Sequence, residues 1–342
     1  MNVQTSEYCA VGHPDRVCDY IASYLLDRYL EHDRTARVAL EVQLKDTFCT
    51  VSGEVTSSWR FTEGEIAELV REAIRKVGYT DEYRDKWGRE NAISGSDVEV
   101  TIHLSQQSGD IAQGVNREGW GDQGIFFGLA VNDQKHGHMP LDYWLAREIG
   151  TALYRSDWGG KDVKTQVTVI DGTPVECVVA IPLDPVTEYD MKKLIVDYVK
   201  VLAGDKCEVI VNGTGRYVTH GPIGDCGTTG HKLVVDFYGG NSKIGGGSPW
   251  GKDPTKADVA LNRLARKKAL DWLVEQNLDE VRCAISCAIG RSQIRVTMTD
   301  GGGNVLKCWS EDCPPSHVID ELHLAEPAYA ETCREGLFGH ER

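Results

Sequence analysis

Residues 164–181 read KTQVTVIDGTPVECVVAI, and this stretch decides the fold class. It contains two segments, Lys164 to Ile170 and Val175 to Ile181, in which apolar and polar residues alternate as in a strand with one buried face. The Asp-Gly pair between them is a strong signal for a tight hairpin turn. A helical pattern follows over residues 189–202, and a further strand is predicted over residues 207–211. The stretch therefore predicts a hairpin, a helix and a third strand.

The same order of elements is predicted earlier in the chain. Apolar residues alternate from Val38 to Leu44, and a second strand ends near Val55. Thr62 and Glu65 have the spacing of a capping box, which predicts the start of a helix. A strand over residues 98–104 closes this unit. Two rounds of one pattern indicate internal repetition.

The last part of the chain, from about Gly221, adds a third region. We predict a strand from Lys232 to Tyr238, a long helix over residues 254–275, and strands over residues 281–289 and 294–299. The predicted fold class is α+β, with helices covering one face of each mixed or antiparallel sheet. Because 342 residues exceed what one hydrophobic core usually serves, two or three domains are expected.

The composition argues against several classes of protein. The chain has 37 Lys and Arg against 52 Asp and Glu, and its net charge of −15 disfavours nucleic acid as a partner. No apolar run reaches the roughly 18 residues of a membrane span, and the N-terminus has no signal-peptide pattern. The eleven cysteines form no CxxC pair, so we expect reduced thiols rather than a zinc site. These features predict a cytoplasmic protein with neither a membrane nor a nucleic-acid partner.

The motif Gly12-His13-Pro14-Asp15-Arg16 comes directly before apolar residues at helical spacing. Its polar side chains are therefore predicted to crowd a helix N-terminus, where the helix dipole and free N–H groups favour bound anions. The alternative is a capped helix in which Asp15 only complements the dipole.

Three glycine-rich loops carry further polar residues. Residues 245–256 (GGGSPWGKDPTK) resemble a phosphate-binding Walker A loop, but Asp253 stands where that motif needs Ser or Thr, so we reject a P-loop NTPase. Residues 219–232 (THGPIGDCGTTGHK) and 119–124 (GWGDQG) are the other two loops. The alternative for residues 245–256 is a flexible linker, and the alternative for each of the other two loops is a structural turn. Together these parts of the sequence supply carboxylates, which suit Mg²⁺, and lysines, which suit phosphate oxygens. These residues are Asp15, Asp122, Asp225, Asp258, Lys164, Lys232, Lys252 and Lys256.

At these motifs the sequence closely resembles the S-adenosylmethionine synthetase (methionine adenosyltransferase) family. GHPDRVCDYI is similar to the family's GHPDK segment, and GDQGIFFG contains its GDQG. HGPIGDCGTTGHK is similar to GGPxGDxGLTGRK, and GGGSPWGKDPTKAD to GGGAFSGKDPSKVD. The similarity covers nearly the whole chain in order, from Thr5 to Phe338.

The resemblance implies a fold and an assembly. The family has three similar α+β domains arranged around a pseudo-threefold axis, which we expect over residues 1–110 (N-terminal), 118–218 (central) and 219–342 (C-terminal). Its active sites lie between subunits, so a homodimer is expected, with a tetramer possible.

The resemblance also implies a reaction. In the family, the sulfur of L-methionine attacks C5′ of ATP and displaces the triphosphate, which is then hydrolysed to pyrophosphate and phosphate. The expected activity is that of a cytoplasmic transferase of one-carbon metabolism that requires Mg²⁺, two ions per site, and K⁺.

Site residues follow from the resemblance position by position. The catalytic residues would be His13, Lys164, Asp225 and Lys232. Besides these four, ATP would contact Asp162, Arg216, Tyr217, His231, Ser248 and Lys252. Besides Asp225, methionine would be held by Glu54, Gln107 and Lys256. Asp15 and Asp258 would hold Mg²⁺, Glu41 would hold K⁺, and Asp122 would lie in a loop that lines the pocket.

Three features depart from the family pattern. Arg16 replaces a lysine, His231 replaces an arginine that contacts polyphosphate, and the segment between Gln113 and Asp122 is short. His231 and the short segment motivate one alternative, a non-catalytic homologue that binds an active synthetase. A separate alternative is an ATP-hydrolysing enzyme that does not use methionine, against which Glu54, Gln107 and Lys256 argue.

Overall fold

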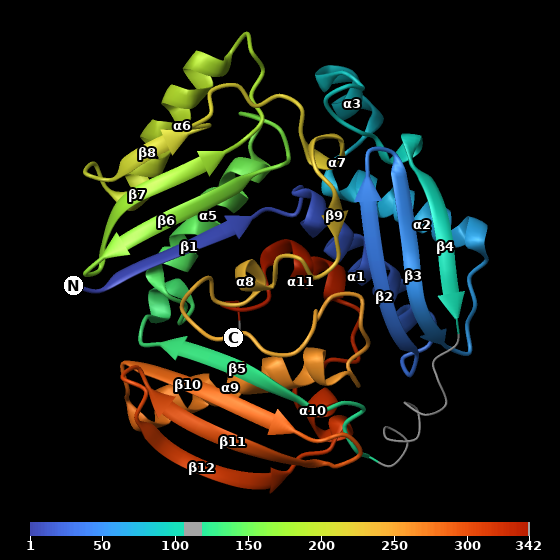
Figure 1. Cartoon of the computed structure of the whole chain (residues 1–342), viewed down its shortest axis with the longest axis vertical. Helices are drawn as coiled ribbons and strands as arrows, with labels where there is room; N and C mark the ends of the chain where they lie inside the picture. Colours follow the sequence, from blue (N-terminus) through green and yellow to red (C-terminus); the bar gives the residue numbers. More distant parts are fainter. Residues whose placement is uncertain (106–117, 341–342) are drawn as a thin grey trace.

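The structure is a computed structural model that describes residues 1–105 and 118–340. Within these residues the strands form three four-stranded sheets. In each sheet a strand from a distant part of the chain lies antiparallel beside the first strand of a hairpin, and a further strand completes the other edge. Figure 1 shows the three sheets placed around a centre that contains helices. The predicted α+β class with three similar units is confirmed.

The first sheet contains the earlier of the two predicted hairpins. In order, its strands are β9 (Gly227–Thr228), β2 (Arg37–Lys45), β3 (Phe48–Thr56) and β4 (Glu99–Ser105). β2 and β3 are antiparallel, whereas β4 runs parallel to β3, since a helical crossover joins them. The helices that pack on this sheet are α1 (Pro14–His32) and α2 (Glu63–Val77). The predicted capping box is present at the start of α2, where the side chain of each of Thr62 and Glu65 accepts from the other's N–H.

The second sheet repeats this plan with the hairpin of residues 164–181. In order, its strands are β1 (Val3–Cys9), β6 (Lys164–Ile170), β7 (Thr173–Ala180) and β8 (Glu208–Val211). Asp171 and Gly172 have φ of 47° and 77°, so the turn is made by two left-handed residues, which match the twist of the strands. The helices on this sheet are α5 (Leu141–Arg155) and α6 (Glu188–Ala203).

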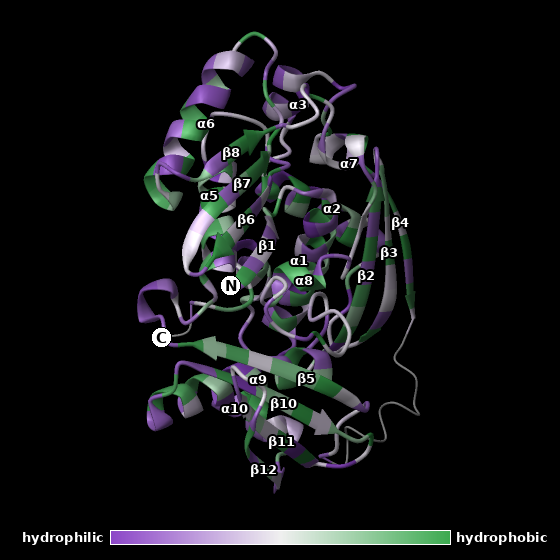
Figure 2. Ribbon diagram, turned by 60° about the vertical axis from the view of Figure 1, so that its left-hand side comes forward, coloured by the Kyte–Doolittle hydropathy of each residue, from purple (hydrophilic) through white to green (hydrophobic). Residues whose placement is uncertain are grey.

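The third sheet is wholly antiparallel. In order, its strands are β5 (Gly124–Val131), β10 (Glu280–Cys287), β11 (Gln293–Asp300) and β12 (Val305–Asp312). Helix α9 (Ala257–Gln276) packs on β5 and β10, and α10 (Pro315–Glu321) packs on α9. Figure 2 shows β5 in the pale to green shades of apolar residues, since its sequence GIFFGLAV has no polar side chain. A Cβ at Gly128 would lie 2.1 Å from the Ala265 carbonyl oxygen of α9, so this glycine lets the strand pack closely on the helix.

The remaining elements are short and mostly connect the three units. They are α3 (Asp81–Trp87), the 3-10 helices η1 (Gly95–Asp97) and η2 (Gln134–His136), α7 (Gly221–Gly224), α8 (Leu233–Asp236) and α11 (Tyr329–Glu335). The predicted strand from Lys232 to Tyr238 is wrong, because this segment forms α8. Val235, Phe237 and Tyr238 are buried at the centre of the molecule rather than in a sheet, Val234 is exposed, and Asp236 turns inward to an ion pair with Arg16. No described helix has the length and apolar character needed to cross a membrane.

The sheets do not follow the chain order. β1 comes from the N-terminal part of the sequence but pairs in the second sheet, and β5 comes from the central part but pairs in the third. The division at residues 110, 118 and 218 therefore stays a prediction about sequence segments.

Asp27 of α1 anchors α11, and this contact predicts a pH-dependent stability. The buried Asp27 carboxylate accepts from the N–H groups of Tyr329 and Ala330 at 2.9 and 2.8 Å, and burial raises its pKa to about 6. The native state therefore keeps a proton between about pH 4 and pH 6 that the unfolded state has lost, so this group stabilises the protein there and the effect is lost as pH rises through 6. Lowering the pH from 7.5 to 5 should stabilise the wild type by about 1.4 kcal/mol relative to Asp27→Asn.

Urea unfolding of both proteins at the two pH values measures this difference. Parallel pH dependence in the wild type and Asp27→Asn would show that Asp27 does not titrate in this range.

Candidate active site

The first turn of α1 carries the first candidate residues. His13 is the N-cap of the helix, and its Nδ1 accepts from the Asp15 N–H at 3.2 Å. A Cβ at position 12 would lie 2.1 Å from the Lys161 carbonyl oxygen, so the close approach of these two segments requires Gly12. The Tyr79 hydroxyl donates to the Gly12 carbonyl oxygen at 2.6 Å and fixes the same turn.

Asp15 connects this helix start to the loop of residues 219–232. Its Oδ1 accepts from the Thr228 N–H at 2.9 Å, and its Oδ2 lies 2.6 Å from Lys232 Nζ. Burial alone would raise the pKa of Asp15, but the hydrogen bonds from Lys232 and Thr228 outweigh it and lower the pKa below its ordinary value. Burial opposes the charge of Lys232, yet its bond to Asp15 leaves the pKa of the lysine raised. Both groups therefore carry charge at neutral pH.

His13 is neutral in this setting. Burial lowers its pKa, an effect that the nearby Asp162 only partly offsets. Since Nδ1 accepts from a main-chain N–H, the proton of the neutral imidazole belongs on Nε2. His13 can therefore donate one hydrogen bond to a ligand without adding a full positive charge.

Asp162 lies two residues before the start of β6 and joins two more segments to the site. Its Oδ2 accepts from the Tyr217 hydroxyl at 2.7 Å and from the Gly221 N–H at 2.8 Å. Burial and the adjacent Asp162 raise the pKa of Tyr217, so its hydroxyl remains a donor. The ring of Tyr217 is thereby held in one position beside the first turn of the loop.

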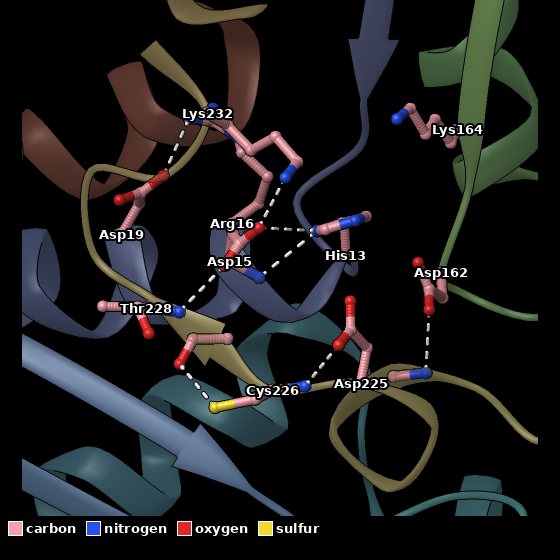
Figure 3. A network of polar contacts seen from close by, with 12 residues as sticks. His13, Asp15, Arg16, Asp19, Asp162, Lys164, Asp225, Cys226, Thr228 and Lys232 are labelled. Carbon is pink, nitrogen blue, oxygen red and sulfur yellow. Dashed lines mark hydrogen bonds and ion pairs between the residues drawn. The ribbon is translucent and has the colours of Figure 1, made fainter.

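Lys164 and Asp225 complete this group, which we call the α1 cluster: His13, Asp15, Asp162, Lys164, Tyr217, Asp225 and Lys232. Figure 3 shows Lys164 and Asp225 on opposite sides of His13, with the Asp225 carboxylate on the side of its loop that faces Asp15 and His13. Lys164 Nζ pairs with Glu7 of the neighbouring strand β1 at 2.7 Å. The cluster thus presents a neutral donor, two lysines and three carboxylates.

A second group of predicted residues forms around the loop of residues 245–256. Lys252 Nζ lies 2.6 Å from Asp258 Oδ2, and Asp258 Oδ1 accepts from the Gly247 N–H at 2.7 Å. Burial raises the pKa of Glu41, and interactions with the nearby Lys252 and His231 lower it in part, so these side chains are neighbours. We call Glu41, His231, Lys252 and Asp258 the α9 cluster. Ser248, buried in the same loop, accepts from the Trp250 N–H at 3.2 Å.

Two of the predicted residues share the outer face of the first sheet. Val38, Leu40 and Val42 of β2 are buried against the helices, so the alternate residue Glu41 points to the opposite face. Glu54 of β3 pairs in register with Ala39 of β2 and lies on that same face. Glu41, which is expected to hold K⁺, and Glu54, one of the residues expected to hold methionine, are therefore on a sheet surface rather than inside the α1 cluster.

The other predicted residues are placed as follows. Lys256, the N-cap of α9, pairs with the buried Asp253 at 3.2 Å. Asp122 and Arg216 are exposed, and Asp122 Oδ1 accepts from the Gln123 N–H at 2.8 Å. Gln107 lies outside the described residues.

Arg16 departs from the expectation that it faces a bound anion. Its guanidinium is 2% exposed and contacts the carboxylates of Asp19 and Asp236. Because α1 is the central helix and is surrounded by packed elements, polar residues on it point into the interior as well as toward the site. The expected role of Arg16 at the anion site is therefore wrong.

Three residues that pair with cations of the candidate motifs were not predicted from the sequence. They are Glu7, which pairs with Lys164, and Asp19 and Asp236, which pair with Arg16. A signal existed for Asp236, because one carboxylate inside the apolar run Leu233 to Tyr238 indicates a paired, buried charge.

The described residues contain no group of three or more His, Cys, Asp or Glu that could hold a metal by itself. Asp15 and Asp258 nevertheless fit Mg²⁺, since each carboxylate binds one lysine and one N–H and has lone pairs left over. Mg²⁺ commonly binds through one or two carboxylates and completes its shell with substrate phosphates and water.

Comparison with known proteins decides the family. Models of the N-terminal, central and C-terminal domains of S-adenosylmethionine synthetase match residues 1–109, 117–217 and 219–342. The chain belongs to the S-adenosylmethionine synthetase family. Members of this family make S-adenosylmethionine from ATP and methionine.

Individual relatives agree with this assignment to the S-adenosylmethionine synthetases. The S-adenosylmethionine synthase of Sorangium cellulosum is 36% identical over 98% of this chain and 85% of its own length. That of Wolinella succinogenes is 35% identical over 98% and 92%. The solved structure of an unusual S-adenosylmethionine synthetase from Campylobacter jejuni aligns with a TM-score of 0.89 and 28% identity, over 99% of this chain and 95% of that one.

Proposed function

We propose that this chain is a methionine adenosyltransferase that transfers the adenosyl group of ATP to the sulfur of L-methionine. The observation that carries the proposal is the α1 cluster, in which distant parts of the chain place His13, Lys164 and Lys232 around one helix N-terminus. A site of this kind suits a polyphosphate leaving group, because fixed cations and N–H groups stabilise the charge that develops as the C–O bond breaks.

We assign the residues of the α1 cluster as follows. Nε2–H of His13 donates to the departing triphosphate oxygen, and Lys164 and Lys232 neutralise the triphosphate. Tyr217, held by Asp162, packs on the adenosine as an aromatic surface. Asp225 contacts both nucleoside and methionine, and Arg216, beside Tyr217, completes the nucleotide site. The displaced triphosphate is hydrolysed to pyrophosphate and phosphate in the same site.

We assign metals to residues of both clusters. Asp15 and Asp258 hold two Mg²⁺ ions, and Glu41 holds K⁺. When bound, Mg²⁺ neutralises part of the triphosphate charge and polarises its oxygens. Lys252 and Ser248 extend the polyphosphate site, and His231 faces it where the family has arginine. The GDQG loop with Asp122 lines the pocket.

We further propose a homodimer with active sites between the subunits. Glu54, Gln107 and Lys256 are, with Asp225, the proposed methionine residues, and Glu54 and Glu41 lie on the outer face of the first sheet rather than in the α1 cluster. A partner subunit whose outer face packs on this one would bring its α9 cluster and methionine residues to the α1 cluster. Sedimentation velocity tests the dimer, and a tetramer would be built from two such dimers. All eleven cysteines are free thiols, as the cytoplasm maintains them, and we retain that location in the proposal.

The test is product formation. Purified protein is incubated with ATP, methionine, Mg²⁺ and K⁺, and S-adenosylmethionine is measured by mass spectrometry, with methionine and Mg²⁺ omitted in turn. Product that requires both is the expected result. ATP binding without product would indicate the non-catalytic homologue, and hydrolysis at the same rate without methionine would indicate an ATP-hydrolysing enzyme.

A further inference from the structure

We infer that Arg16 is a positioning residue that fixes the two loops carrying Lys232 and Lys252 against helix α1. The inference rests on the proposed function for the role of these two lysines. It assigns a task to a residue that touches neither the triphosphate site nor the methionine residues.

Arg16 lies at the junction of three elements. It belongs to the first turn of α1, and its Nη1 contacts Asp19 Oδ2 of the same helix at 3.2 Å. Nη1 also contacts Asp236 Oδ1 of α8, and Nη2 donates to the Cys333 carbonyl oxygen of α11 at 2.6 Å. The guanidinium lies over the ring of Trp250, 5.2 Å from its centre. One side chain therefore holds α1, α8 and α11 together.

The two carboxylates that Arg16 holds continue the network into the two loops. Asp19 Oδ1 accepts from the Gly230 N–H at 2.8 Å, and Asp236 Oδ2 accepts from Trp250 Nε1 at 2.7 Å. Gly230 comes two residues before Lys232, and Trp250 comes two residues before Lys252. Each loop is thus tied to Arg16 through one carboxylate, close to the lysine that it presents.

The charges explain what the arginine does in this chain. Burial and the neighbouring carboxylate raise the pKa of Asp19, and burial raises the pKa of Asp236. The Arg16 cation lowers both values and keeps two fully buried carboxylates side by side. A planar guanidinium reaches both carboxylates and the carbonyl of Cys333, whereas the single ammonium of lysine lacks the second nitrogen.

The test compares Arg16→Lys with Arg147→Lys. Arg147 is also 2% exposed, and among the described residues its hydrogen bond from Nη1 to the Phe338 carbonyl oxygen at 2.5 Å anchors the C-terminal segment rather than either loop. The probe is inorganic tripolyphosphate with Mg²⁺, whose binding is measured by isothermal titration calorimetry. KM values for ATP and methionine are measured alongside, with thermal unfolding as the control for stability.

The expected result is that Arg16→Lys weakens tripolyphosphate binding and raises KM for ATP about tenfold, since small displacements of positioned groups have large effects. KM for methionine should rise less than KM for ATP, because Glu54 and Gln107, two of the four proposed methionine residues, belong to neither loop. Arg147→Lys should lower the melting temperature and leave tripolyphosphate binding at the wild-type value.

Equal effects of the two substitutions on tripolyphosphate binding would overturn the inference and leave Arg16 as support for the core. If Arg16→Lys does not fold, Trp250→Phe provides the answer, because it removes the bond from Nε1 to Asp236, and its thermal unfolding measures the separate cost of the smaller ring at this buried position. Binding about threefold weaker or worse is then expected, and wild-type binding would overturn the inference. A wild-type protein that binds tripolyphosphate but makes no S-adenosylmethionine would refute the proposed function without contradicting the positioning role of Arg16.

Discussion

Replacing Lys164 with alanine is expected to lower kcat for S-adenosylmethionine formation by about 10³-fold, the upper range for removing one group that stabilises developing charge. Lys164 begins β6 beside the α1 cluster, and its ammonium lies on the other side of His13 from Asp225. Within the chain it pairs with Glu7, and both side chains are partly exposed. The loss of such an exposed pair costs at most about 1 kcal/mol of stability, so the variant should fold.

Lys192→Ala is the matched control. Lys192 forms an ion pair of the same length, 2.7 Å, with Glu188 on helix α6, outside both clusters. Initial rates at saturating ATP and methionine, measured by mass spectrometry, should separate the two variants. A Lys164→Ala protein that keeps full activity would refute the assignment of Lys164.

Asp15→Asn is expected to lower kcat by about 10²-fold to 10³-fold and to raise the Mg²⁺ concentration needed for activity. Asparagine can still accept from the Thr228 N–H through its oxygen, but its amide group would face Lys232 where a carboxylate oxygen now lies at 2.6 Å. The substitution therefore removes a proposed metal ligand and releases the lysine in one step.

Kinetics over a range of Mg²⁺ concentrations measure this effect, with Asp271→Asn as control. Asp271 also lies 2.6 Å from a lysine, Lys267, but on the exposed side of α9. Unchanged kcat and an unchanged Mg²⁺ requirement in Asp15→Asn would exclude Asp15 as a metal ligand.

Because the pKa of Asp15 is lowered, its carboxylate should stay charged, and its contribution to stability should persist, until the pH falls below about 4.

Local patterns predicted much of the secondary structure. The hairpin at Asp171-Gly172 and the capping box at Thr62 depend on residues that are close in sequence. Both can therefore be predicted from neighbouring residues alone. The predicted strand over residues 232–238 failed because the apolar run Leu233 to Tyr238 indicates burial, and burial alone does not distinguish a strand from a short helix at the centre of the molecule.

The candidate site was likewise predictable from local patterns only in part. The motifs placed His13 and Asp15 at a helix N-terminus, and α1 begins there. The contact between Asp15 and Lys232 joins positions 217 residues apart, and no local pattern could predict it. The pairing of Lys164 with Glu7 likewise requires β1 to lie beside β6.

The sequence by itself determined the α+β class, the two repeated units and the motifs of the family, because alternation, turn residues and caps act between neighbours in the chain. Only the tertiary structure decided that β1 and β5 join sheets made mainly of later segments, and that Arg16 turns inward to Asp19 and Asp236. The physical reason is that α1 is packed on nearly all sides, so its charged residues must find partners in the interior, and those partners come from whichever elements surround it.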